Sequence, residues 1–207
     1  MIYDRVDISS EAVPLAREPI FQHMVDTYAG ETNKTASTWR AFHDDDLSFR
    51  PHLKSSTVEE IMKHQLLSER RFFAEFLGAP EMQAAAVLPS EFSVSTLSRR
   101  LVELAVPRLA WIAAQDQTCW LARVKFFDVE RERIWVFWRR VLHSAHHRTQ
   151  LTVYLRLLNR TVPPTYGPTA DTGGLFQNGA RVIYLDGTPG GPTIPVATDK
   201  PVTERPD

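Results

Sequence analysis

The sequence holds a single cysteine, Cys119, so the chain can form neither an internal disulfide nor a cysteine-rich zinc site. One free thiol agrees with a reducing compartment. Residues 1–19 lack the apolar run of a signal peptide, and no segment approaches the roughly 20 apolar residues of a membrane span. We therefore expect a cytoplasmic protein with no membrane partner.

The chain also lacks an excess of charge of either sign. It carries 24 basic and 25 acidic residues, for a formal net charge of −1. Arginine pairs occur at 70–71, 99–100 and 139–140, but they fall on different predicted helices. A nearly neutral chain with scattered arginines has no electrostatic reason to bind nucleic acid, and we expect no such partner.

Two common catalytic motifs are missing as well. The glycines of GTPGGP, at 187–192, lack the strand-loop-helix context and the Gly-Lys-Ser/Thr ending of a phosphate-binding loop. No serine stands in a recognisable nucleophile elbow, which leaves Ser-His-Asp hydrolysis without support. The sequence thus directs attention to other chemistry.

Glycine and proline are scarce until the C-terminal quarter of the chain. Residues 160–207 contain seven of the nine glycines and eight of the fourteen prolines, a composition that cannot continue a helix. We predict a domain at 1–159 followed by an irregular extension at 160–207. Asn178-Gly179 between short apolar runs predicts a β-hairpin in that extension, and a loosely attached tail that ends in disorder after about residue 190 is the alternative.

The first 160 residues, by contrast, carry apolar residues at helical spacing. Four long helices are predicted at about 19–42, 56–78, 95–115 and 129–159, joined by loops that include a non-helical link at 118–128. Pro107 is expected to kink the third helix because it removes a backbone donor. Four helices of this length predict an all-α four-helix bundle.

Local signals refine these helices. Ser56 and Glu59 have the spacing of a capping box at the start of the second helix. Asp44, Asp45 and Asp46 are interpreted as a solvated turn. The fourth helix is apolar on nearly every side at 134–138, so the body of the protein or a second subunit must bury it.

A cluster of histidines lies in the fourth helix. His143 and His147 are four residues apart, which places them about 40° apart on one helical face, where two imidazoles can hold one metal ion. Gln150 and Tyr154 continue that face, and His146 lies about 60° to its side. The alternative is that both histidines are ordinary polar residues satisfied by neighbours.

A metal site in a bundle needs a further ligand from a facing helix. His64 is the best-placed candidate, because it lies about 60° from Ile61 on the flank of the second helix's apolar stripe. The remaining histidines, His23, His43 and His52, are interpreted as structural or exposed.

Two stretches carry a resemblance to a known family. Residues 49–73, with the turn Arg50-Pro51-His52, and residues 126–156, with His-x3-His-Arg-x-Gln, resemble the DinB-like superfamily of damage-inducible, metal-dependent proteins. The resemblance covers about residues 20–160 and implies a four-helix bundle, often dimeric, with a divalent metal held by three histidines. Thr149 stands where family members commonly have glycine, a change that should not disturb the ligands.

Carried onto this sequence, the resemblance implies His64, His143 and His147 as the metal ligands. Three protein ligands leave positions open for water or substrate, whereas structural zinc sites are closed by four. Imidazole nitrogens suit zinc or nickel among the divalent ions. Relatives that use a low-molecular-weight thiol imply a metal-dependent thiol S-transferase or isomerase that is homodimeric.

Two other functions remain open. One is a metal-binding stress-response or dimeric binding protein without turnover, and the other is a helical interaction module without metal. Ligand histidines usually donate their other ring N–H to a carboxylate or carbonyl. Glu31, Glu69 and Asp128 are the first candidates for such a partner, and the sequence assigns none of them. His146, Gln150 and Tyr154 are candidates for the pocket or the surroundings of the ligands, although Tyr154 is equally expected in the core.

Overall fold

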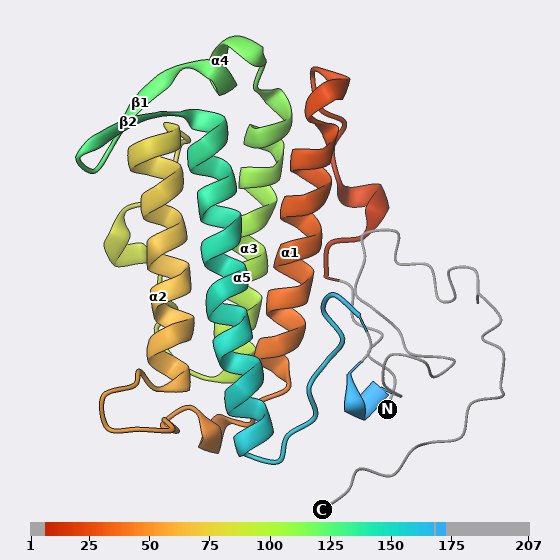
Figure 1. Ribbon diagram of the computed structural model, residues 1–207, viewed down its shortest axis with the longest axis vertical. Coiled ribbons are helices and arrows are strands. Elements are labelled where there is room, and N and C mark those ends of the chain that lie inside the picture. The colour runs from red at the N-terminus through yellow and green to blue at the C-terminus, as the bar shows by residue number, and fades with distance from the viewer. Residues whose placement is uncertain (1–6, 168, 173–207) are drawn as a thin grey trace, which may run out of the picture.

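The computed structural model describes residues 7–167 and 169–172. The hairpin predicted at Asn178-Gly179 lies outside these residues. The long helices are α1 (Gln22–Arg40), α2 (Val58–Arg71), α3 (Val94–Ala114) and α5 (Arg133–Leu157), with a short α4 (Gln117–Leu121). They form the predicted bundle, in which α5 lies between α1 and α2 and contacts both (Figure 1).

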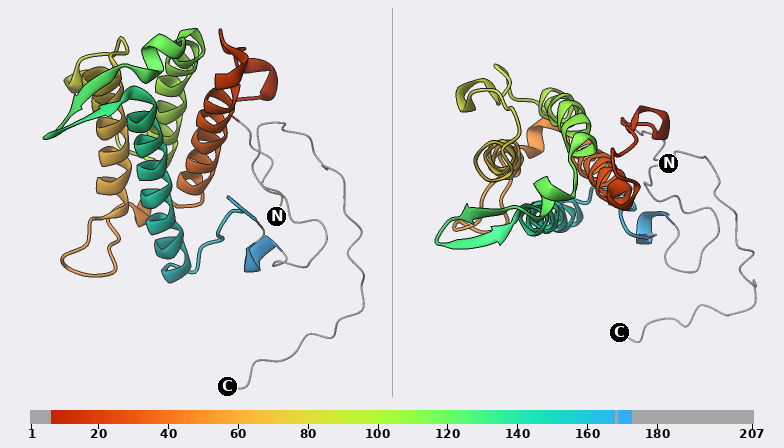
Figure 2. Two further views of the ribbon diagram at one scale, coloured as in Figure 1. Left: turned by 45° about the horizontal axis from the view of Figure 1, so that its top comes forward. Right: turned by 90° about the horizontal axis from the view of Figure 1, so that it is seen from above.

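Short elements connect the long helices. They are the 3-10 turns η1 (Ser10–Ala12), η2 (Pro19–Phe21), η3 (Asp44–Asp46), η5 (Ala84–Ala86) and η6 (Ala170–Thr172), the π-helical turn η4 (Phe72–Leu77), and the strands β1 (Arg123–Phe126) and β2 (Val129–Glu132). Seen from above, the strands project from one side of the bundle beside α5 (Figure 2). No helix within the described residues is long and apolar enough to cross a membrane.

The β1–β2 hairpin corrects the predicted start of the fourth helix. Residues 129–132, expected to be helical, form β2, and α5 begins at Arg133. Arg123 pairs with Glu132 across the antiparallel ladder, and their side chains form an ion pair of 3.0 Å. Phe127 turns the chain with a φ of 54°. Opposite charges that face each other across two strands stabilise a hairpin. This pairing favours an extended conformation over a helix at residues 129–132.

The start of α2 differs by one residue from the prediction. Thr57, not Ser56, is the N-cap: its hydroxyl accepts a hydrogen bond from the Glu60 amide, and the Glu60 carboxylate accepts one from the Thr57 amide. The expected capping-box chemistry is therefore present, shifted by one position. The helix ends as predicted at Gly78, whose φ of 79° suits a residue without a Cβ.

The turn of three aspartates is only partly solvated. Asp46 is buried and forms an ion pair of 2.9 Å with Arg160, and its carboxylate also accepts a hydrogen bond from the His43 amide. Asp44 accepts one from the amide of Val94 at the start of α3. The predicted solvated turn was wrong for Asp46, because a charge run gives no sign of a partner 114 residues away.

Two apolar clusters form the core of the bundle. One contains Phe73, Trp120 and Phe137, and the other contains Trp39, Met62, Leu97 and Leu151. Along α1, α2 and α5 a polar stretch separates the clusters. Its buried charged residues include Glu31, Glu69, Arg140 and Arg148, joined by Arg108 from α3. The candidate metal site lies at this polar level.

Candidate metal centre

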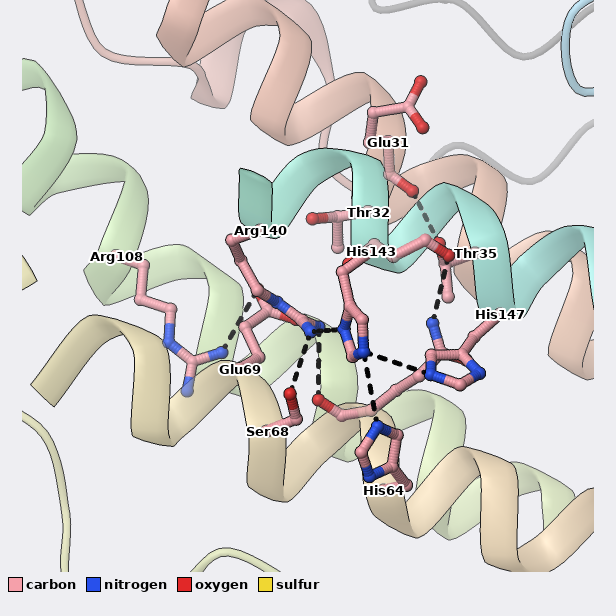
Figure 3. Close-up of polar contacts among 12 residues, drawn as sticks. Glu31, Thr32, Thr35, His64, Ser68, Glu69, Arg108, Arg140, His143 and His147 are labelled. Atoms are coloured by element: carbon pink, nitrogen blue, oxygen red, sulfur yellow. Dashed lines mark hydrogen bonds and ion pairs between the residues drawn. The ribbon is translucent and has the colours of Figure 1, made fainter. Parts of the chain in front are cut away.

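The three histidines singled out in the sequence come together between α2 and α5 (Figure 3). The Nε2 atom of His143 lies 3.2 Å from Nε2 of His147 and 3.5 Å from Nε2 of His64. One ring nitrogen from each residue falls within 4.8 Å of the others. Three convergent nitrogens at this spacing can surround a single ion.

Helix geometry and packing both place these rings. His143 and His147 follow one another on α5 by a turn, and His64 faces them from α2. The ring of Phe72, at the start of η4, stacks on that of His143 with centroids 6.1 Å apart and an interplanar angle of 18°. His64 is exposed, and the two α5 histidines are half-buried, so the site opens at the surface.

The electrostatics of the site keep the imidazoles neutral. Burial, followed by the positive charge of Arg140, lowers the pKa of His143 to about 3. The same two effects lower the pKa of His64, and burial lowers that of His147. Because a metal ion binds the neutral imidazole, these shifts favour ligation over protonation.

Gln150 orients the His147 ring. Its Oε1 atom lies 2.8 Å from Nδ1 of His147. An amide oxygen only accepts hydrogen bonds, so Nδ1 carries the proton and donates it, and the lone pair of Nε2 points toward the other two rings. This residue, expected from the sequence to line the site, therefore contacts a candidate ligand directly.

Arg140 contacts the other α5 histidine. Its Nη1 atom lies 2.7 Å from Nδ1 of His143, and Nη1 also donates to the Ser68 hydroxyl. Since a guanidinium has only donors, His143 Nδ1 is an acceptor here and the neutral ring holds its proton on Nε2, near the Nε2 acceptor of His147. A neutral His143 could ligate an ion through Nε2 only with its proton on Nδ1, so the Arg140 guanidinium would have to turn away from this ring.

The carboxylates expected beside the ligands lie elsewhere. Glu69 contacts Arg140 and not a histidine: the Nη2 atom of Arg140 lies 3.0 Å from Oε2 of the glutamate. Glu31 forms an ion pair of 2.7 Å with Arg148. Asp128 lies in the exposed turn between the strands. None of the three touches a histidine of the site, and the group that contacts Nδ1 of His143 is the Arg140 guanidinium.

The other pocket candidates divide between surface and core. His146 is exposed, with its ring centroid 5.1 Å from that of His147. Tyr154 is 4% exposed, and its hydroxyl donates to the backbone oxygen of Ser56 at 3.2 Å. Tyr154 therefore takes the core position that the sequence left open as an alternative.

The remaining histidines are exposed, as predicted. The ring of His23 stacks on Trp138 with centroids 5.8 Å apart, and Nδ1 of His52 accepts a hydrogen bond from the Lys54 amide. His43 is the N-cap of the aspartate turn. These contacts account for all three without a ligand role.

The donor set fits a divalent ion. It consists of three neutral nitrogens with no carboxylate among them, so an ion held there keeps its full charge and leaves coordination positions toward solvent. Nitrogen donors favour zinc or nickel over the oxygen-seeking magnesium and calcium. The uncompensated charge favours an anion as a further ligand.

Comparison with known proteins identifies the family of the chain. No curated protein matches the chain. A DinB-like protein of Bacillus subtilis is 22% identical with a TM-score of 0.56, over 70% of this chain and 96% of that one. A DinB-like protein of Bacillus cereus is 19% identical with a TM-score of 0.57, over 69% of this chain and 95% of that one. The model of the DinB family matches residues 15–174, and the chain therefore belongs to the DinB family.

Proposed function

We propose that the protein binds one divalent metal ion, zinc or nickel, through His64, His143 and His147. The observation that carries this proposal is the convergence of the three Nε2 atoms at 3.2 and 3.5 Å. Gln150 would hold one ligand ring in the ligating orientation. The open side of the site leaves room for a small molecule beside the ion.

We further propose that the site serves a metal-dependent thiol transfer. When bound, the ion would stabilise a low-molecular-weight thiol as its thiolate. The thiol proton passes to solvent, sulfur forms a bond to an electrophilic carbon, and the leaving group departs with its electron pair. The surrounding arginines supply a positive field that favours an anionic sulfur, and His64 lies at the exposed edge where the thiol enters.

Elemental analysis of the purified protein tests the metal site. We expect about one zinc or nickel ion per chain in the wild type and its loss in His64→Ala. His146→Ala is the matched control, because His146 neighbours the site but lies outside the three convergent nitrogens. Full metal content in His64→Ala would show that the assigned triad is wrong.

Turnover is tested separately on protein of known metal content. Glutathione, cysteine and dithiothreitol are each combined with 1-chloro-2,4-dinitrobenzene, and thioether formation is followed by absorbance. We expect a rate that His64→Ala and His147→Ala abolish and His146→Ala retains. Full metal occupancy without turnover for any pair would instead favour the metal-binding protein without catalysis.

We also propose a homodimer formed through the outward face of α5. Leu142, Val153 and Leu157 on that face are 64%, 54% and 55% exposed, and Leu142 and Val153 border a shallow hollow beside Gln150. Exposed apolar side chains along one helix are typical of an interface. Analytical ultracentrifugation should give twice the chain mass for the wild type and the single mass for Leu142→Glu, and a monomeric wild type would refute this.

A further inference from the structure

An arginine with no acidic partner among the described residues lies beside the candidate metal centre. Arg139 is exposed on α5, one turn before His143. No ion pair or hydrogen bond joins its side chain to residues 7–167 or 169–172. Residues four apart on a helix are neighbours on its surface, so Arg139 lies next to His143.

Two acids at this end of the molecule pair with other arginines. Glu132 pairs with Arg123 at 3.0 Å, and Glu75 pairs with Arg71 at 2.9 Å. These two carboxylates therefore do not balance the charge of Arg139. A free guanidinium offers two parallel N–H donors, the arrangement that matches a carboxylate.

Aromatic rings continue from the triad toward the hairpin. The ring of Phe72 stacks on His143, that of Phe126 lies 5.6 Å from Phe72, and that of Trp135 lies 5.4 Å from Phe126. Trp135 is 40% exposed and stands four residues before Arg139 on α5. Phe72 and Phe126 are buried, so Trp135 is the exposed ring of this series, and the Arg131 guanidinium lies 5.4 Å from its centroid. Trp135, Arg139 and His143 thus follow one another along the same helix.

We propose that Arg139 binds the carboxylate of a small substrate whose apolar part packs on Trp135 and whose electrophilic carbon reaches the triad. The inference rests on the proposed function and names its substrate class: apolar or aromatic carboxylic acids. Side chains four apart on a helix lie about 6 Å from each other. A substrate that spans Arg139 and the triad therefore carries its reactive carbon roughly two to four bonds from the carboxylate.

Cinnamate is a suitable binding probe, because its carboxylate tests the contact with Arg139 and its phenyl ring tests the contact with Trp135. Its Kd is measured by calorimetry on the full chain, with and without zinc, beside uncharged cinnamyl alcohol. The variants are Arg139→Gln, Arg139→Lys and Trp135→Leu. Arg99→Gln is the charge-matched control, since Arg99 is an exposed arginine on α3 that pairs with Glu103.

For Arg139→Gln we expect the Kd of cinnamate to rise at least tenfold and that of cinnamyl alcohol to stay unchanged. Arg139→Lys should recover part of the lost cinnamate affinity. Trp135→Leu should weaken the binding of both cinnamate and cinnamyl alcohol, and Arg99→Gln should change the binding of neither. Equal cinnamate affinity in wild type and Arg139→Gln, an equal loss in Arg99→Gln, or no binding to the wild type would each overturn the proposal. An Arg139 effect in a protein that takes up no zinc would uphold this site and refute the proposed metal function.

Discussion

Replacing Glu69 with glutamine should strongly destabilise the bundle. The side chain is buried, and its carboxylate accepts from Arg140 at 3.0 Å, pairs with Arg108 at 3.4 Å and accepts a hydrogen bond from the Tyr28 hydroxyl. Glutamine has nearly the same shape but no charge, so Arg140 stays buried without a counter-ion, whereas Arg108 keeps its ion pair with Glu81. Loss of one partner from a buried ion pair costs about 3–5 kcal/mol, which corresponds to a fall in Tm of roughly 6–20 °C for a chain of this size.

Urea unfolding followed by far-ultraviolet circular dichroism measures this loss in free energy. Glu75→Gln is the matched control, because Glu75 pairs with arginines at the surface, where such a change costs about 1 kcal/mol or less. If Glu69→Gln unfolds within 1 kcal/mol of the wild type, the reasoning from buried charge is wrong.

The same carboxylate predicts a dependence on pH. Burial alone would raise the pKa of Glu69, but Arg140 and Arg108 outweigh it and hold the pKa below the ordinary value of 4.5. The unfolded chain therefore takes up the proton first as the pH falls. The Glu69 carboxylate makes its full contribution to the free energy of unfolding well above pH 4.5. That contribution is lost as the pH falls through the lowered pKa of the folded state, and Glu69→Gln should not show this loss.

Three further outcomes are expected. Gln150→Leu should weaken zinc binding about 10–100-fold in a competition titration, because His147 loses the acceptor that orients it, and an unchanged affinity would contradict that role. Zinc at 100 times its Kd should raise the free energy of unfolding by about 2.7 kcal/mol in the wild type and by almost nothing in His64→Ala. Thr57→Ala should lower the free energy of unfolding by about 1 kcal/mol, and Ser56→Ala should lower it by less than about 0.5 kcal/mol. The reverse order would show that Ser56 is the N-cap.

Much of the bundle could be predicted because its signals are local. Helical spacing of apolar residues gave the four long helices, and Gly78 marked the end of the second. His143 and His147 share a face by their spacing alone. The approach of His64 from α2 depends on how two helices pack, and it came from the flank position together with the family resemblance.

The surroundings of the ligands could not be read in the same way. Arg140 lies three residues before His143, a spacing that indicates contact, but a guanidinium is not the usual partner of a ligand histidine. Its anchor, Glu69, is 71 residues away in the chain, and only the packing of α2 against α5 brings the two together. Residues 129–132 were predicted to be helical because the apolar residues at 134–138 favour a helix, and a strand of four residues carries only a weak signal of its own.

The charged level between the two apolar clusters also bears on how the helices align lengthwise. Sliding α5 along α2 by one turn, about 5.4 Å, would still place apolar side chains against apolar side chains, but it would part Glu69 from Arg140. Buried ionic groups of this kind can fix register. The same slide would carry His143 away from His64, so metal uptake would serve as a direct readout of whether the helices have locked in the correct alignment.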